Sequence, residues 1–130
     1  MSPLYYSIKR LLYILGADRF CNIMEQLTDK SMEGFISKPM AGIVLFRADW
    51  CPFCRKFKPV FDSYEGRTKA RMAEAVVNED ENPLWDRFNI QVIPTMIAFK
   101  DGKVTARMDG IAGRGLDEAD MKDLISKIEA

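Results

Sequence analysis

The stretch that decides the fold is Gly42-Ile43-Val44-Leu45-Phe46-Arg47-Ala48-Asp49-Trp50-Cys51-Pro52-Phe53-Cys54. It begins as an apolar run rich in β-branched and aromatic side chains, which predicts a strand over residues 42–48 that is buried on both faces. Beyond the cysteines, apolar side chains recur at helical spacing, at Phe53, Phe57, Val60, Phe61 and Tyr64. The sequence therefore predicts a buried strand that leads into a helix, with two cysteines at the junction.

The spacing of Cys51 and Cys54 favours redox chemistry. Cysteines three residues apart in a first helical turn lie on one face, close enough to form and open a disulfide. The positive end of the helix dipole, together with Arg55 and Lys56, favours the thiolate of Cys51. We therefore expect Cys51 to attack and Cys54, deeper in the turn, to resolve. Structural thiols or half of a metal site are the alternatives, but the chain has no histidine and no second closely spaced pair, so no metal site is expected.

The segments around the junction alternate between strand and helix patterns. A strand over residues 72–78 and a short helix from about Glu79 to Phe88 follow the first helix, which is typical of parallel pairing. Residues 92–99 and 104–108 flank a turn containing Asp101-Gly102 and predict a β-hairpin. Further helices are expected over residues 31–37 and 117–129. Pro59 predicts a kink in the helix that starts at the cysteines.

The N-terminal segment, residues 1–22, is expected to be a helical extension of a domain that spans residues 23–130. Its apolar stripe suits packing on this domain or on a dimer partner better than membrane anchoring, and it lies at Leu4, Ile8, Leu11, Leu12 and Leu15. No run approaches the roughly 18 apolar residues of a membrane span, and Lys9 and Arg10 interrupt any signal-peptide core. Met24 is an alternative translation start. Cys21 is more typical of a small buried side chain than of a regulatory disulfide.

Composition restricts the function further. The 130 residues are 48% hydrophobic, as in one globular domain, and 19 basic residues balance 19 acidic ones. Zero formal charge argues against a general nucleic-acid binder. The absence of histidine excludes Ser-His-Asp and Cys-His nucleophile pairs. An odd count of three cysteines argues against a disulfide-stapled secreted scaffold and favours a reducing, cytoplasmic setting.

Residues along the chain resemble the thioredoxin family in order and spacing, over about residues 23–130. The matching elements are Phe46-Arg47-Ala48-Asp49-Trp50-Cys51-Pro52-Phe53-Cys54, the helix proline Pro59, Ile93-Pro94-Thr95 and Phe99-Lys100-Asp101-Gly102. The resemblance implies an α/β thioredoxin fold, in which helices flank a central mixed β-sheet. It also implies a thiol-disulfide oxidoreductase that reduces protein disulfides through a redox-active Cys51–Cys54 pair, without a bound cofactor.

The resemblance also implies a substrate surface. The residue that matches Pro94 is a cis-proline in the family, packed against the active-site disulfide, and Gly110 resembles a family glycine of the contact surface. The expected substrate-binding residues are Trp50, Pro52, Phe53, Ile93, Pro94 and Gly110. For Trp50, filling the core is an equal alternative. The implied partners of a monomer are protein disulfides and an electron donor, either a reductase similar to thioredoxin reductase or a small thiol.

Three departures from the family pattern affect the chemistry. Pro52-Phe53 stands where thioredoxins have Gly-Pro and is closer to glutaredoxins. Leu45 replaces the family's buried aspartate, so the usual proton-relay acid is expected to be missing, with its lysine partner replaced near Val76 or Val77. Arg47 replaces a common tryptophan. We expect Arg47 and Asp49 to be solvated charges, with proton handling as the alternative.

Two other functions remain open from the sequence. The Pro-Phe pair would suit a glutaredoxin-like or more oxidising oxidoreductase or isomerase that uses a small thiol. A non-catalytic interaction module, tethered by its N-terminal helix, is the third hypothesis, although both cysteines of the pair are intact.

Overall fold

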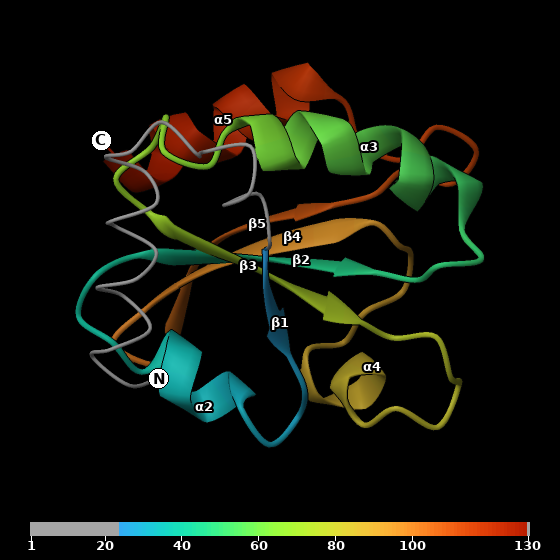
Figure 1. Cartoon of the computed structure of the whole chain (residues 1–130), viewed down its shortest axis with the longest axis horizontal. Helices are drawn as coiled ribbons and strands as arrows, with labels where there is room; N and C mark the ends of the chain where they lie inside the picture. The colour runs from blue at the N-terminus through green and yellow to red at the C-terminus, as the bar shows by residue number, and fades with distance from the viewer. Residues whose placement is uncertain (1–23, 130) are drawn as a thin grey trace, which may run out of the picture.

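The structure is a computed structural model that describes residues 24–129. Within this range a five-stranded sheet with the order β1-β3-β2-β4-β5 lies between helices (Figure 1). The strands are β1 (Glu25–Leu27), β2 (Gly42–Arg47), β3 (Arg71–Val76), β4 (Thr95–Lys100) and β5 (Lys103–Asp109). The helices are α2 (Met32–Ile36), α3 (Pro52–Ser63), α4 (Leu84–Arg87) and α5 (Glu118–Glu129).

The sheet is mixed, as the resemblance implies. Strand β3 pairs in parallel with β1 and with β2, whereas β4 pairs antiparallel with β2 and with β5. The turn at Asp101 and Gly102 closes the β4–β5 hairpin, and both residues have positive φ angles, 55° and 79°. The strand-helix-strand order and the hairpin formed by the last two strands are therefore confirmed.

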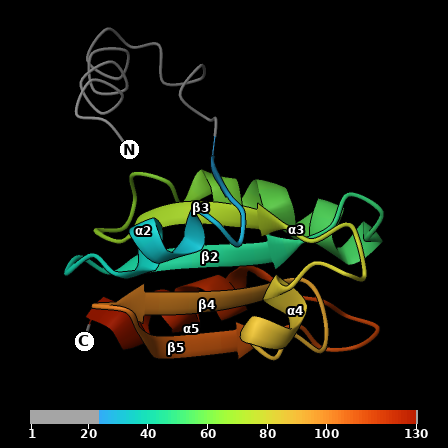
Figure 2. The same cartoon turned by 90° about the horizontal axis from the view of Figure 1, so that it is seen from below.

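Helices cover both faces of the sheet. Figure 1 shows α3 and α5 on one face and α2 and α4 on the other, and Figure 2 looks onto the face that carries α2 and α4. Alternate side chains of β2 point to opposite faces. Ile43 and Leu45 therefore pack with Phe57 and Phe61 of α3, whereas Val44 and Phe46 pack in the core beside α2 and α4. This arrangement confirms that β2 is buried on both faces, and it fixes where α3 begins.

Some element boundaries differ from the expectation. Strand β1 was not predicted, because three residues are too few for a periodic pattern. Strand β4 begins at Thr95 and not at Val92, because Pro94 has no N–H to donate to a ladder. Helix α3 continues through Pro59, which lies on its exposed side, and the kink expected there stays a prediction. The predicted short helix is reduced to α4, and Glu79, Asp80 and Glu81 lie before it.

The predicted N-terminal extension and Cys21 lie outside the described residues, and the sequence-based expectations about them stay predictions. In residues 24–129, no helix is long and apolar enough to cross a membrane.

Candidate active site

The junction between β2 and α3 brings the two cysteines together. Cys51 is the N-cap of α3 and Pro52 occupies the first helical position, where a missing N–H costs nothing. The backbone N–H of Cys54 donates to Sγ of Cys51 over 3.3 Å, and both cysteines are free thiols. The predicted placement of the pair in the first turn of a helix is confirmed.

The two thiols differ in their surroundings. Both thiols lie in the same apolar cluster, where Cys54 is 1% exposed and Cys51 is 4% exposed, and Sγ of Cys51 lies 3.8 Å from the carbonyl oxygen of Ile93. Burial raises the pKa of the Cys54 thiol to about 12, and the hydrogen bond with Cys51 adds to this increase. Cys54 therefore holds its proton near neutral pH.

The segment before β4 lies against Cys51. Its packing also involves Gly110, the residue directly after β5. The Ile93–Pro94 peptide bond is cis, and both residues are buried. A Cβ on Gly110 would lie 2.4 Å from the carbonyl oxygen of Pro94, closer than any side chain can approach. Gly110 therefore permits the chain after β5 to pack directly on the Pro94 segment.

Exposed apolar side chains surround the cysteines. Trp50, Phe53 and Ile111 are 56%, 37% and 53% exposed. Phe53 packs over Gly115, where a Cβ would lie 2.8 Å from Cβ of Phe53. Trp50 is displayed at the surface and is not a core residue. Ile111 was missed by the sequence analysis, although its position directly after Gly110 was a usable signal.

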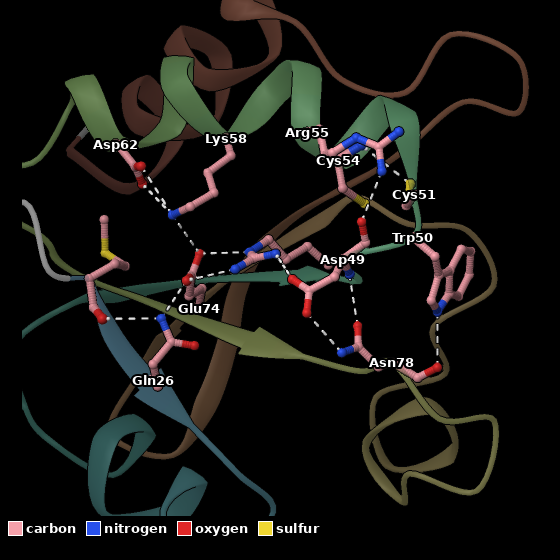
Figure 3. Close-up of polar contacts among 12 residues, drawn as sticks. Gln26, Asp49, Trp50, Cys51, Cys54, Arg55, Lys58, Asp62, Glu74 and Asn78 are labelled. Atoms are coloured by element: carbon pink, nitrogen blue, oxygen red, sulfur yellow. Dashed lines mark hydrogen bonds and ion pairs between the residues drawn. The ribbon is translucent and has the colours of Figure 1, made fainter.

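Trp50 is held by the loop that follows β3. Its indole Nε1 donates to the carbonyl oxygen of Asn78 over 2.9 Å (Figure 3). The side chain of Asn78 accepts from the backbone N–H of Asp49 and donates to its carboxylate, over 2.8 and 2.9 Å. Hydrogen bonds from Asn78 and Arg47 lower the pKa of Asp49, which is an exposed charge as expected. Asp49 is thus ionised at neutral pH.

The strand beside Leu45 carries a buried acid, and the replacement of the family lysine near Val76 or Val77 stays a prediction. Leu45 lies in register with Glu74 of β3, and not with Val76 or Val77. Glu74 is 1% exposed, so a buried acid is present after all, one strand away from the expected position. The sequence analysis missed it. A usable signal was the single carboxylate of β3, which lies between Ala73 and Ala75.

Three side chains satisfy the buried carboxylate of Glu74. Nε of Arg47 lies 2.9 Å and Nζ of Lys58 lies 3.1 Å from Oε2, and Gln26 donates to Oε1. Burial alone would raise the pKa of Glu74, but the hydrogen bonds from Arg47, Gln26 and Lys58 outweigh it and hold the pKa below its usual value. Glu74 is therefore a carboxylate at neutral pH, with no free capacity to act as the family's proton-relay acid.

Arg47 is not the solvated charge that the sequence predicted. Its side chain is 13% exposed and lies between Glu74 and Asp49, with Nη1 2.8 Å from Oδ1 of Asp49. The strand position explains this burial, because Arg47 and Leu45 are two residues apart on β2 and face the same side.

Among residues 24–129, no group of three or more metal-ligating side chains is arranged to hold a metal ion.

Comparisons with known proteins agree with this geometry. The thioredoxin family model matches residues 23–127. A thioredoxin of Alicyclobacillus acidocaldarius is 32% identical over 100 residues, which cover 76% of this chain and 95% of that protein. The probable protein disulfide-isomerase A4 of Caenorhabditis elegans is 34% identical over 93 residues, 72% of this chain but only 14% of that longer protein.

A solved structure shows the same fold. Thioredoxin f2 of Chlamydomonas reinhardtii superposes with a TM-score of 0.70 at 21% identity, covering 82% of this chain and 96% of that one. The family match spans most of the chain and includes the cysteine pair. The chain therefore belongs to the thioredoxin family of thiol-disulfide oxidoreductases.

Proposed function

We propose that this protein reduces disulfide bonds in protein substrates, with Cys51 as the nucleophile and Cys54 as the resolving thiol. The observation that carries the proposal is the asymmetry of the pair. Cys51 is 4% exposed and lies beside Ile93, whereas Cys54 is 1% exposed and its pKa is raised to about 12. A thiol that keeps its proton does not compete for the first attack.

The reaction proceeds through a mixed disulfide. The thiolate of Cys51 attacks one sulfur of the target disulfide, so a Cys51–target bond forms while the other target sulfur leaves as a thiolate and is protonated by water. Cys54 then loses its proton to water and attacks Sγ of Cys51. The Cys51–target bond breaks and the second target thiolate is released. Two electrons have passed to the target, and a Cys51–Cys54 disulfide remains.

We assign substrate binding to the surface around the pair, formed by Trp50, Pro52, Phe53, Ile93, Pro94 and Gly110. Exposed aromatic side chains are favourable contacts for a polypeptide. The backbone of Gly110 lies directly against Pro94, and we propose that an extended substrate segment pairs with the backbone beside them. Ile111 extends this surface and is added to the assignment.

The electron donor is proposed to be a reductase similar to thioredoxin reductase. A small thiol such as glutathione is the second candidate, and it is favoured by Pro52-Phe53 between the cysteines, which is closer to glutaredoxins than to thioredoxins. Glutaredoxins have potentials of about −200 to −230 mV, compared with roughly −270 mV for thioredoxin. A more oxidising pair would also suit disulfide isomerisation, the activity in the name of the Caenorhabditis elegans relative.

We further propose that the protein acts as a cytoplasmic monomer on protein disulfides and not on nucleic acid or membranes. The balanced charge of the chain supports the part of this proposal that concerns nucleic acid. An interaction module tethered by residues 1–22 would not need two free thiols in the first turn of α3, so the catalytic proposal is preferred.

The test is an insulin-reduction assay with two electron sources. NADPH with a thioredoxin reductase is compared with NADPH, glutathione and glutathione reductase, and the Cys51→Ser/Cys54→Ser double variant serves as the control. We expect turnover that is faster with the thioredoxin reductase. Faster turnover with glutathione would favour the second candidate, and turnover no faster than that of the double variant with both sources would refute the reductase proposal.

A further inference from the structure

The buried face of α3 near Cys54 carries charges that the reaction described above does not use. Cys54 and Lys58 are four residues apart on α3 and share one face of the helix. Figure 3 shows Cys54 and Lys58 projecting from α3 toward Asp49 and Glu74. This face therefore lies directly over the ion pairs that join β2 to β3.

Arg47 is the last residue of β2, at the end of the strand that leads into the cysteine turn. Its chain neighbour Ala48 accepts a hydrogen bond from the backbone N–H of Cys51 over 3.3 Å and lies in the same core cluster as Cys54. Nη1 of Arg55, on the helix residue after Cys54, donates to the carbonyl oxygen of Asp49 over 3.0 Å. The segment from Arg47 to Asp49 is thus fixed against the first turn of α3.

The guanidinium is held in a fixed position. Arg47 donates from Nε and Nη2 to the two carboxylate oxygens of Glu74, over 2.9 and 3.2 Å, and from Nη1 to Asp49. A paired fork of this kind restricts both the position and the orientation of the charge. Glu74 also contacts Lys58, which Asp62 holds from the far side over 3.0 Å.

We propose that Arg47 is a positioning residue for the resolving step, a fixed cation that favours the thiolate of Cys54 after Cys51 has bonded to its target. This rests on the proposed roles of Cys51 and Cys54. In the family the corresponding region holds an acid that receives a proton, but here Leu45 is apolar and Glu74 is fully engaged. The proton of Cys54 therefore goes to water, and the cation lowers the cost of losing it.

The direction of the electrostatic effect agrees with this role. Burial raises the pKa of Cys54 and the contact with Cys51 adds to the increase, whereas a backbone hydrogen bond at Ala48 and, to a smaller extent, the charge of Arg47 act in the opposite direction. A cation close to a buried thiol stabilises its charged form, an effect that falls off with distance and solvent screening. The charged and titratable groups that face this cluster are Glu74 of β3, Asp49 of the turn, and Cys54, Arg55, Lys58 and Asp62 of α3.

The test separates the two thiol reactions with a small aromatic disulfide, 5,5′-dithiobis(2-nitrobenzoate). Attack by Cys51 releases one coloured thiolate at a rate that depends on reagent concentration. Attack by Cys54 on the resulting mixed disulfide releases the second at a rate that does not. Stopped-flow absorbance on the full chain therefore reports the resolving step separately, and the result does not depend on whether insulin is a substrate.

We expect Arg47→Met to slow the second phase about tenfold near neutral pH, as it would if the pKa of the Cys54 thiol rose by about one. The rate of the first phase should change less than twofold. Arg47→Lys restores most of the rate because it keeps the charge. The matched control is Lys58→Met, which also removes a cation from Glu74 but not the one beside Ala48. It should leave the second phase within twofold of the original.

The proposal is overturned if Arg47→Met leaves the second phase unchanged over neutral to mildly alkaline pH, or if Lys58→Met slows it equally. Should Arg47→Met fail to fold, Arg47→Gln keeps a hydrogen bond to Glu74 without the charge. The Gln and Lys variants then decide the same question, and equal second-phase rates in the two would refute the proposal. Failure of insulin reduction with both phases intact would contradict the proposed function alone.

Discussion

The two sides of the cysteine pair are built differently. The outer side, with Trp50 and the Pro94 segment, follows the thioredoxin pattern that the sequence shows, and departs from it only at Pro52-Phe53 between the cysteines. The inner side, beneath Cys54, has an apolar Leu45 in place of the family acid and an ion cluster centred on Glu74 and Arg47. The contrast teaches that the geometry of attack can be retained while the electrostatics behind the resolving thiol are rearranged.

The largest expected effect separates the two cysteines. Cys51→Ser should lower the rate of insulin-disulfide reduction to the uncatalysed rate, because the residue that bonds to the target is lost. Cys54→Ser should instead accumulate mixed disulfides with targets, because nothing displaces the bound sulfur. Non-reducing electrophoresis with mass spectrometry detects the trapped species. If Cys51→Ser were the variant that trapped partners, the roles of the two thiols would be reversed.

The inner side is tested by Glu74→Gln. Removing one member of a buried ion pair leaves Arg47 poorly compensated, so we expect the free energy of unfolding at neutral pH to fall by about 3 kcal/mol. Urea denaturation measures this. The matched control is Glu79→Gln, an exposed acid that should change stability by less than about 0.5 kcal/mol. Equal stability of the two variants would mean that the cluster contributes nothing.

The same variant has a pH signature. The pKa of Glu74 is lower in the folded protein than its ordinary value of 4.5. Its contribution to stability is therefore fully present above that value and is lost as pH falls through the folded pKa. The original protein should lose more stability on acidification than Glu74→Gln does. Parallel acid-unfolding curves for the two proteins would contradict the assignment.

The outer side is tested by Gly110→Ala. The added Cβ would meet the backbone carbonyl of Pro94 at 2.4 Å, so the segment beside Cys51 must move. We expect a loss of about 1–3 kcal/mol in stability, as for other overpacked sites, together with slower insulin reduction. Gly34→Ala in α2 is the control, because nothing lies within 4 Å of its added Cβ. If both variants match the original protein in stability and in the rate of insulin reduction, the close approach of Gly110 to Pro94 has no effect on either.

The smallest expected effect concerns the contact between Trp50 and the loop after β3. Asn78→Ala removes the side-chain hydrogen bonds to Asp49 but keeps the backbone carbonyl that Trp50 uses. We expect a stability loss of about 1 kcal/mol and a change in tryptophan fluorescence. The Trp50→Phe background shows which part of the fluorescence change comes from Trp50 and which from Trp85. An unchanged spectrum and midpoint would show that Asn78 does not order this turn.

The outer side could be predicted because its residues form local patterns. Apolar side chains in Gly42–Arg47 and helical spacing after Cys51 place the pair at a strand-helix junction without any long-range information. Glu74 could not be placed in the same way, since the alignment of β3 beside β2 depends on packing between residues distant in sequence. The burial of Arg47 follows from that register, so both errors about charge have one origin. The exposure of Ile111 and the start of β4 depend on how the segments around Pro94 and Gly110 pack together.

The central claim is that Cys51 reacts first and that Cys54 reacts only in the second step. Limited alkylation of the reduced full chain with iodoacetamide at neutral pH, followed by peptide mass spectrometry, tests this most directly. The structure predicts modification of Cys51 while Cys54, which is 1% exposed and has a pKa raised to about 12, stays unmodified. Modification of Cys54 at the same rate as Cys51, or before it, would contradict the account.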